Sequence, residues 1–203
     1  MIIELLLPIV FGYLLGSVPF ALVIGKVFYK TDIRQHGRKN LGGGNAGRVL
    51  GKKAGLAVMT LDILKVSLAV FLASFFPHRE LTMTIAGLAA AVGHCLPLFA
   101  RFRGGKAVAV MYGYLFGMML CRPCSPLVFF LPLITFLVIL YLTKIIALSS
   151  IGSAVTVTVY TALAVGSPVM TAALVIFSVM IVWRHRSNLA RIRKGEENKI
   201  SWM

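Results

Sequence analysis

The sequence has few charged residues, and acidic residues are the scarcest of them. Asp and Glu together number 6 against 21 Lys and Arg, and charged residues fill only 13% of the 203 positions. A water-soluble globular domain needs a polar surface that a chain with 59% hydrophobic residues and a mean hydropathy of +0.90 does not supply. The composition excludes a soluble domain and predicts an integral membrane protein.

Cysteines are also scarce, and their spacing excludes a tetrahedral zinc site. Of the three cysteines, Cys121 and Cys124 form a single Cys-x-x-Cys pair, without the second Cys or His pair that zinc requires. We expect no metal here, while a disulfide, a packing role and no role all stay open. Internal repeats are lacking too, which argues against an inverted-repeat transporter.

Long apolar runs fill most of the chain. They cover residues 2–29, 54–76, 82–100, 107–120, 126–142, 146–166 and 168–183. A bilayer core requires roughly 20 helical residues, so the fourth and fifth runs are short and could be tilted or partly re-entrant. We predict one all-α polytopic membrane domain over residues 1–203, with about seven transmembrane helices.

The Lys and Arg residues gather between particular runs. With the N-terminus placed outside, seventeen of the 21 lie on the cytoplasmic side, and only Arg79 and Arg122 lie outside. The C-terminus is then cytoplasmic, together with three basic segments, residues 32–53, 94–106 and 184–199. The net charge of +15 does not indicate nucleic-acid binding, because no soluble domain fits between the runs. The three segments could meet at one phosphate-binding site.

The first basic segment, residues 32–53, interleaves glycine with amide and basic side chains. The candidate substrate-binding residues here are Asn40, Gly42, Asn45 and Arg48. Five glycines between Gly37 and Gly47 are expected to exclude a regular helix and to expose N–H groups that can surround an anion. Ala46 replaces a glycine that a P-loop requires, so nucleotide hydrolysis is not indicated. The alternative is a flexible cytoplasmic loop.

The second basic segment, residues 94–106, ends in Gly104-Gly105-Lys106. We expect Pro97 to end one helix and Lys106 to open the next, where a lysine beside free N–H groups favours phosphate. The alternative is a positive-inside loop in which Lys106 extends to lipid headgroups. His94 alone is more typical of a helix-end packing residue than of a catalyst.

The third basic segment, residues 184–199, begins at the end of an apolar run. His185 and Asn188 are three positions apart, so on a continuing helix they share a face that could cap a polar pocket. A basic helix attracted to anionic lipid is the alternative, favoured for Arg193, Lys194 and Lys199.

Two intramembrane charged residues and two glycine pairs are explained by structure rather than by a functional site. Asp62 and Lys65 could form a proton relay, but a structural ion pair is favoured. The pairs Gly12-x-x-x-Gly16 and Gly113-x-x-x-Gly117 indicate close helix packing.

In this order and spacing, the motifs resemble the acyl-phosphate:glycerol-3-phosphate acyltransferase family, PlsY. The matching residues include Gly16-Ser-Val-Pro-Phe20, Asp32-Ile-Arg, Asn40, Gly42, Asn45, Arg48, Asp62-Ile-Leu-Lys65, Gly93-His94, Gly104-Gly-Lys106, Leu148-Ser-Ser-Ile151, Arg184-His-Arg, Asn188 and Glu197-Asn-Lys-Ile200. The resemblance implies a seven-helix enzyme of the bacterial inner membrane. Such an enzyme transfers an acyl group from acyl phosphate to the 1-hydroxyl of glycerol-3-phosphate, forming lysophosphatidate without a metal or cofactor.

The chain departs from the family pattern at several positions. Arg38-Lys39 stands where the family usually has Ser-Gly, Gly43-Gly44 replaces Ala-Thr, Ala107 replaces glycine and Ser187 replaces glutamate. A substrate-shifted or non-catalytic paralogue is therefore an alternative, as is a transporter or binding protein for organic phosphate or lipid.

The chemistry of an acyl phosphate suggests roles for the candidate residues. Its good leaving group makes a covalent acyl intermediate unnecessary, so positioning and charge neutralisation could suffice. We expect Lys106 with Gly104 and Gly105, and Arg48 with Asn40 and Asn45, to bind the two substrates' phosphates. His185, Asn188 and Ser150 would orient the acceptor. The base is either His185, since an imidazole titrates near neutral pH, or the substrate's own phosphate. The sequence leaves the oligomeric state open.

Overall fold

The structure is a computed structural model that describes residues 2–200. These residues form helices and connecting loops, with no β-strand among them. The expected all-α class is therefore confirmed for the described part of the chain. Two compact units make up the protein, residues 1–121 and residues 122–203.

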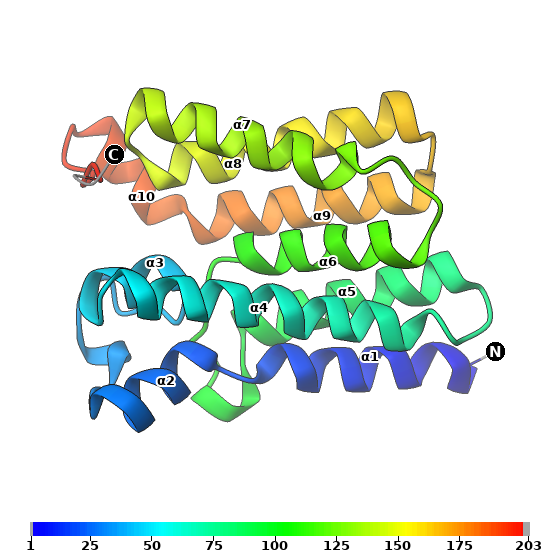
Figure 1. The fold of residues 1–203 in the computed structure, drawn as a ribbon, viewed down its shortest axis with the longest axis horizontal. Coiled ribbons are helices and arrows are strands. Elements are labelled where there is room, and N and C mark those ends of the chain that lie inside the picture. Colours follow the sequence, from blue (N-terminus) through cyan, green and yellow to red (C-terminus); the bar gives the residue numbers. More distant parts are fainter. Residues whose placement is uncertain (1, 201–203) are drawn as a thin grey trace. The chain divides into compact units, whose positions relative to one another are not determined.

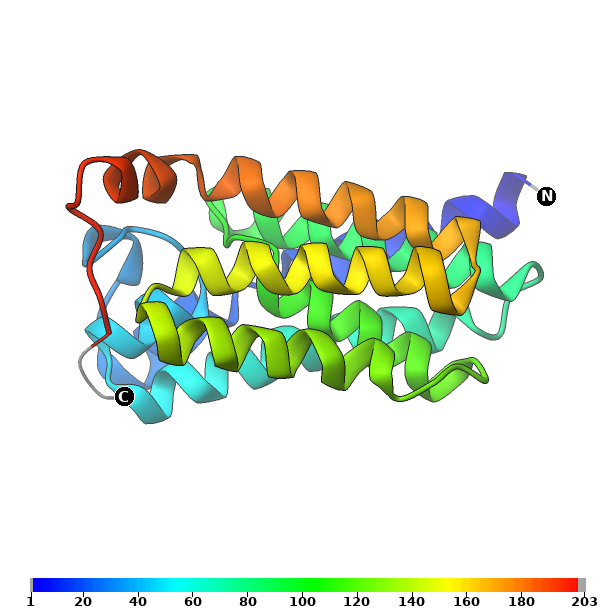
Figure 2. The same cartoon turned by 90° about the horizontal axis from the view of Figure 1, so that it is seen from above.

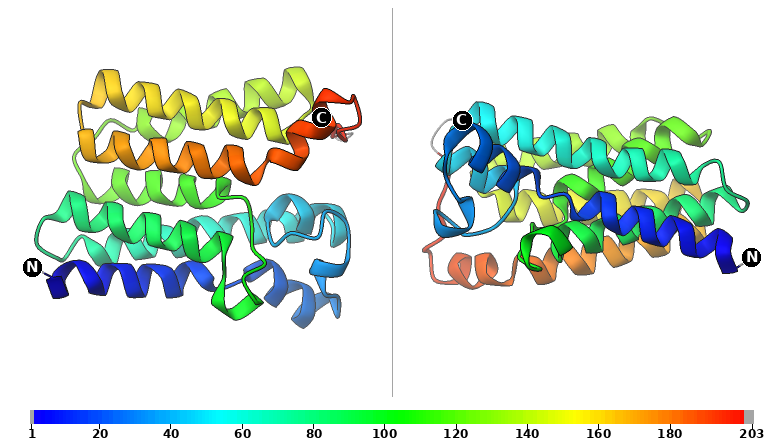
Figure 3. Two further views of the ribbon diagram at one scale, coloured as in Figure 1. Left: turned by 180° about the vertical axis from the view of Figure 1, so that it is seen from behind. Right: turned by 90° about the horizontal axis from the view of Figure 1, so that it is seen from below.

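The first unit is built from four long helices that run side by side, with shorter helices at one end (Figure 1). Its elements are α1 (Ile2–Ser17), α2 (Phe20–Tyr29), η1 (Ile33–Gln35), α3 (Gly43–Val49), α4 (Lys52–Ala73), α5 (Arg79–Cys95), η2 (Leu98–Ala100) and α6 (Val108–Cys121). Helix α1 packs on α5, and α4 packs on both α5 and α6. The loop that contains η2 protrudes beside the end of α5 (Figure 3).

Glycines allow the long helices of this unit to approach one another closely. A Cβ atom at Gly12 would lie 2.6 Å from the carbonyl oxygen of Ala86 in α5, and one at Gly16 would overlap the carbonyl of Ala90 in the same helix. Gly113 and Gly117 of α6 lie against α4 in the same way. The interpretation of both glycine pairs as packing positions is confirmed.

The first apolar run is two helices rather than the single helix expected over residues 2–29. Pro19 has no N–H group, so the hydrogen-bond ladder cannot pass through it. The N–H of Leu22 bonds to the carbonyl of Pro19 at 2.8 Å. The carbonyl of Val18 accepts a hydrogen bond from Lys65 Nζ at 2.8 Å instead. A side chain from α4 thus stabilises the break between α1 and α2.

The second unit contains α7 (Leu127–Thr143), α8 (Ile146–Tyr160), the π-helical turn η3 (Thr161–Val165), α9 (Pro168–Arg184) and α10 (Arg186–Arg193). Helix α8 packs on both α7 and α9 (Figure 2). After α10 the chain returns to the turn between α7 and α8, where the N–H of Ile200 donates to the carbonyl of Lys144 at 2.9 Å. This bond places the third basic segment and that turn at the same end of the unit.

The lengths of the apolar helices bear on the number of membrane spans. All seven apolar runs contain helix, and within residues 2–200 four stretches are long and apolar enough to cross a bilayer: Ile3–Tyr29, Lys52–Ala73, Arg79–Ala100 and Ile146–Val165. The bent pair α9 and α10 raises this number to five if it is one span. Helices α6 and α7 have 14 and 17 residues, so the runs that looked short in the sequence are short helices. Seven spans and the sides of the two termini stay predictions.

Candidate functional site

The first basic segment contains a short helix, so the expectation that its glycines exclude helical structure was wrong. Helix α3 includes Gly43 and Gly47, which face Gly55 of α4. A Cβ atom at Gly55 would lie 2.6 Å from the Cα atom of Gly47. The missing side chains let α3 pack directly on the backbone of α4, and this tertiary contact offsets the low helix propensity of glycine.

Asn45 fastens the loop that precedes α3. Its side chain is 1% exposed. Its Nδ2 group donates to the carbonyls of Ile33 (3.3 Å), His36 (3.2 Å) and Asn40 (3.1 Å), and its Oδ1 accepts from the N–H of Arg38 (2.7 Å). The amide is thus engaged with the loop backbone. Asn45 therefore shapes the segment, while Arg48 is exposed on the last turn of α3.

Asn40 and Gly42 lie just before α3. Asn40 Oδ1 is buried and has no hydrogen-bond donor within residues 2–200. A Cβ atom at Gly42 would meet nothing within 4 Å, so space is open beside this residue. An acceptor without a donor and an open backbone position are both compatible with the expected contact to a polar substrate.

Asp32 and Arg34 hold the beginning of the first basic segment. Arg34 Nη2 and Nε lie 2.6 and 2.9 Å from the two carboxylate oxygens of Asp32, and the N–H of Arg34 donates to Asp32 at 3.0 Å. The hydrogen bonds from the Arg34 side chain, opposed in part by burial, lower the pKa of Asp32 to about 2. Asp32 is ionised at neutral pH, and the guanidinium of Arg34 has an anionic partner within the chain.

The second basic segment forms the loop between α5 and α6. Lys106 was expected to open α6, but the helix begins two residues later, at Val108. The reason is Ala107, whose φ of 64° is left-handed and interrupts helical geometry. Lys106 is half-buried and lies on the loop side of this interruption.

The two glycines before Lys106 pack onto the end of α5. A Cβ atom at Gly104 would overlap the carbonyl of His94 and lie 2.6 Å from that of Cys95. At Gly105 a Cβ atom would overlap the imidazole ring of His94, and the N–H of Gly105 donates to the carbonyl of His94 at 3.0 Å. This N–H is used inside the protein, so the glycines serve first to bring the loop against α5.

The left-handed conformation of Ala107 leads to a prediction on stability. An L-residue pays about 1–2 kcal/mol in this region, whereas glycine does not, although glycine is more flexible in the unfolded chain. We expect Ala107→Gly to raise the free energy of unfolding by about 0.5–1 kcal/mol, measured by chemical unfolding in detergent. The matched control is Ala109→Gly, inside α6, which should destabilise by a similar amount. Equal effects of the two substitutions would contradict the prediction.

The third basic segment is bent at His185. Helix α9 ends at Arg184, α10 begins at Arg186, and their axes differ by 56°. The condition under which His185 and Asn188 would share one helix face, a helix that continues through both, is therefore not met. The Nδ1 atom of His185 lies 2.8 Å from the carbonyl oxygen of Ile181. Since a carbonyl only accepts, Nδ1 carries the hydrogen, and in the neutral ring Nε2 carries the lone pair.

Asn188 is held by a carboxylate from the returning chain. Its Nδ2 group donates to Glu197 Oε1 at 2.7 Å, and Arg191 Nε donates to Glu197 Oε2 at 2.6 Å. The side chain of Glu197 is only 7% exposed. Sequence reasoning gave Glu197 no role at the site. An acidic residue in a basic segment of a chain with only six Asp and Glu was the signal that could have identified it.

The contacts of Glu197 predict the effect of removing its charge. We expect Glu197→Gln to lower the free energy of unfolding by about 1–3 kcal/mol, because two hydrogen bonds to a buried carboxylate are weakened. Thermal unfolding of the purified protein measures this effect. Glu196→Gln is the matched control, since Glu196 is exposed and adjacent. A loss in the control as large as that in Glu197→Gln would show that the contacts are unimportant.

Ser150 and the three cysteines are the remaining residues for which the sequence raised a possible role. Ser150 is buried in α8, and its hydroxyl donates to the carbonyl of Ile146 at 2.7 Å, so toward a ligand its oxygen can act as an acceptor. In the part of the chain that the structure describes, Cys95, Cys121 and Cys124 are not joined by a disulfide. Within residues 2–200, no three His, Cys, Asp or Glu side chains are placed to hold a metal ion.

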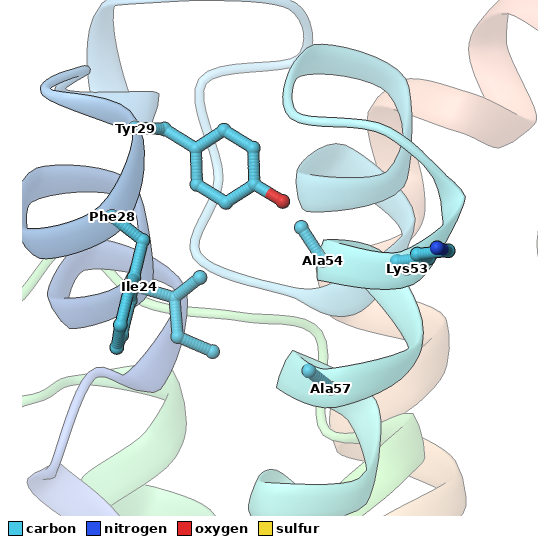
Figure 4. A pocket seen from close by; sticks show the side chains of 6 residues that line it. All are labelled: Ile24, Phe28, Tyr29, Lys53, Ala54 and Ala57. Carbon is cyan, nitrogen blue, oxygen red and sulfur yellow. The ribbon is translucent and has the colours of Figure 1, made fainter.

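An open groove of about 420 Å³ lies between α2 and the first turns of α4 (Figure 4). Its lining residues are Ile24, Phe28, Tyr29, Lys53, Ala54 and Ala57. None of them is a predicted site residue, and the groove is mostly apolar.

Comparison with known proteins identifies the family. The family model described as glycerol-3-phosphate acyltransferase matches residues 6–195, which include the first two basic segments, His185 and Asn188. This chain belongs to the glycerol-3-phosphate acyltransferase family. The family resemblance noted in the sequence is thereby confirmed.

Relatives of the glycerol-3-phosphate acyltransferase family match along the whole chain. A protein named glycerol-3-phosphate acyltransferase from Listeria monocytogenes is 43% identical over 207 residues, covering 100% of both chains. One of the same name from Bacillus cytotoxicus is 44% identical over 202 residues, covering 100% of this chain and 98% of its own. These relatives match in length as well as in sequence.

Two solved structures of PlsY (YgiH), described as an integral membrane glycerol 3-phosphate acyltransferase, are similar in fold. The glycerol 3-phosphate form has a TM-score of 0.88 and 31% identity, and the lysophosphatidic acid form a TM-score of 0.85 and 30% identity. Each comparison covers 97% of this chain and 95% of the other. Together with its apolar helices, this similarity identifies the chain as an integral membrane member of the glycerol-3-phosphate acyltransferase family.

Proposed function

We propose that this protein transfers a fatty acyl group from acyl phosphate to the 1-hydroxyl of glycerol-3-phosphate, with lysophosphatidate and inorganic phosphate as products. The observation that carries the proposal is the family match over residues 6–195. The similar PlsY structures are described as glycerol 3-phosphate and lysophosphatidic acid forms, which fit the proposed acceptor and product. We place the protein in the bacterial cytoplasmic membrane, with its reaction at the cytoplasmic face.

The donor is inferred from the number of basic glycine-rich segments in the first unit. Acyl phosphate and glycerol-3-phosphate each carry one phosphate group. The first unit offers two segments suited to such groups: the loop around α3, with Arg48 and Asn40, and the loop that ends at Lys106. In an acyl-CoA donor the leaving group at the acyl carbon is a thiolate, and the phosphates of coenzyme A lie far from that carbon. Two separate cations for two phosphates therefore favour the acyl-phosphate donor.

The reaction requires one nucleophilic substitution at an acyl carbon. The 1-hydroxyl oxygen of the acceptor bonds to the carbonyl carbon, the bond from that carbon to the phosphate oxygen breaks, and inorganic phosphate leaves. Lys106 is assigned to neutralise the charge that develops on the departing phosphate. The hydroxyl proton passes either to His185 Nε2 or to a phosphate oxygen. The contact of His185 Nδ1 with Ile181 supports the first route, because it directs the lone pair to Nε2.

Asn188 and Ser150 lie in the second unit, and their contacts within that unit support the roles proposed for them. Asn188 is fixed by Glu197, and Ser150 presents an oxygen that can accept a hydrogen bond. Fixed polar groups lower the entropy lost when a substrate reaches its reactive orientation. We assign Asn188 and Ser150 to orientation, and His185 to orientation and to proton transfer.

The proposed reaction is tested with purified protein, palmitoyl phosphate and glycerol-3-phosphate, with palmitoyl-CoA as the control donor. We expect lysophosphatidate from palmitoyl phosphate alone. Product from palmitoyl-CoA alone would contradict the assigned donor. Binding of either substrate without product from any donor would instead indicate a non-catalytic member of the family.

A further inference from the structure

A polar cluster inside the first unit is not used by the proposed reaction. It consists of Asp62 and Lys65 of α4 and His94 of α5, which are 1%, 5% and 5% exposed. Lys65 Nζ lies 2.7 Å from Asp62 Oδ1 and 3.3 Å from His94 Nδ1. The sequence favoured a structural ion pair at Asp62 and Lys65, and the ion pair is present. Ionisable groups among membrane helices are costly, so a third member of the cluster calls for a further explanation.

Lys65 determines which nitrogen of His94 carries hydrogen. An ammonium group has three N–H donors and no lone pair. Lys65 Nζ contacts Asp62, the carbonyl of Val18 and His94 Nδ1. The carboxylate of Asp62 also faces His94 Nδ1, but at 3.6 Å it lies beyond hydrogen-bond distance, so the contact with Lys65 is the shorter one. Because Lys65 cannot accept in that contact, His94 Nδ1 accepts, and the neutral imidazole then carries its hydrogen on Nε2. The cluster thus fixes both the orientation of the ring and the direction of its N–H group.

The Nε2 edge of His94 faces the glycine pair that precedes Lys106. A Cβ atom at Gly105 would overlap His94 Nε2 and would lie 2.9 Å from His94 Cδ2. The N–H of Gly105 also donates to the carbonyl of His94, and Gly104 packs against that same carbonyl. The loop that ends at Lys106 is therefore supported by His94 through both its ring and its backbone.

We propose that His94 is a positioning residue for the phosphate-binding loop, and that Asp62 and Lys65 hold it in place. The inference rests on the proposed function, because it assigns a substrate phosphate to Lys106. The contacts form a chain: Lys65 orients the ring, the ring supports Gly105, and Gly105 precedes Lys106. His94 itself touches no substrate in this scheme. The buried ion pair thereby influences substrate affinity as well as stability.

A purely structural role of the cluster makes a different prediction. Lys65 also bonds to Val18 at the break between α1 and α2, so its cluster contributes to folding in any case. If folding were its only role, changes at His94 would reduce the amount of active protein and leave KM unchanged. A positioning role instead changes KM in protein that remains folded.

Two substitutions of His94 separate these roles. In His94→Asn, the amide oxygen can accept from Lys65 near the position of Nδ1, but no group reaches Gly105. In His94→Gln, the amide nitrogen reaches the position of Nε2 and can contact the loop. We expect His94→Asn to raise the KM of one phosphorylated substrate about tenfold, with a smaller change in kcat. The KM of His94→Gln for that substrate should lie much closer to the wild-type value.

The matched control is Thr84→Val, also in α5. The Thr84 hydroxyl is buried and lies 3.1 Å from the hydroxyl of Tyr114 in α6. The substitution therefore removes a polar contact between the two helices that flank the loop, without touching the loop. We expect both KM values to stay at the wild-type level in this control.

Binding is measured in parallel, so that the test does not require turnover. Thermal shifts of detergent-purified protein with sn-glycerol-3-phosphate and with palmitoyl phosphate give the two affinities. The effect of His94→Asn on affinity should vanish in a Lys106→Ala background, because residues that act through one another are not additive. An undiminished effect there would overturn the proposal.

The remaining outcomes are also decisive. Wild-type KM and affinity in His94→Asn would overturn the positioning role, and so would a lower kcat at constant KM together with a lower unfolding temperature. If the wild type binds a substrate without turnover, the proposed function fails, yet the affinities still decide the role of His94. If the wild type binds neither substrate, both proposals fail.

Discussion

Replacement of Lys106 by alanine is expected to reduce turnover about 10²–10³-fold, because the charge that develops on the departing phosphate loses its cation. Lys106 is suited to this task by its place in the structure. It follows two glycines that pack on α5, and it precedes a left-handed residue that delays the start of α6. Initial rates of lysophosphatidate formation at saturating palmitoyl phosphate and glycerol-3-phosphate measure the effect.

The matched control for this prediction is Arg103→Ala. It removes a positive charge from the same loop, but Arg103 is exposed. An exposed charge near the membrane surface influences local potential more than it stabilises a reacting group, so we expect a change of less than about threefold. Equal losses in the two variants would show that general positive charge, rather than Lys106 itself, supports the reaction.

Replacement of Asp62 by asparagine is expected to lower the free energy of unfolding by about 3–5 kcal/mol, because it leaves the buried ammonium of Lys65 without a counter-charge. The side chain of Asp62 is 1% exposed and its carboxylate lies 2.7 Å from Lys65 Nζ. Chemical unfolding in detergent, followed by circular dichroism, measures the loss.

The double variant Asp62→Asn with Lys65→Met is the control. It leaves no uncompensated charge in the bundle, so it should be more stable than Asp62→Asn alone, although the bond from Lys65 to Val18 is also lost. If the double variant loses as much as the two single variants together, Asp62 and Lys65 do not act as a pair.

Features that depend on local sequence could be predicted. The apolar runs predicted the helices. In a bilayer the backbone N–H and C=O groups must bond to one another, and a helix is one of the few structures that allow this. The glycine pairs at Gly12 and Gly113 were assigned to packing for a similar reason, since a residue without a side chain allows two helices to approach. Family motifs were also visible, because their residues keep a fixed order along the chain.

Features that depend on distant contacts could not be predicted. Helix α3 forms because Gly47 meets Gly55, a contact that glycine propensity alone does not reveal. The supporting role of Asn45 follows from carbonyl groups brought together by the loop. Glu197 was named only as part of the family pattern and given no role, because its contact with Asn188 forms only when the chain folds back. Each of these features depends on which groups the folded chain brings together, and the sequence alone does not reveal those contacts.

The spacing of Asp62 and Lys65 has a consequence for membrane insertion during synthesis. A single charge at the centre of a helix costs about 2.5–3.5 kcal/mol to insert, but these two charges lie three residues apart and pair within α4 itself. The part of α4 that follows Lys52 and Lys53 can therefore enter lipid as an electrically neutral segment. Because helices emerge in sequence order, Val18 is already present when α4 arrives, whereas His94 follows later on α5. Val18, Asp62 and Lys65 are thus synthesised before His94. The loop that bears Lys106 follows His94, so it can pack on the cluster only after all of the cluster's residues are present.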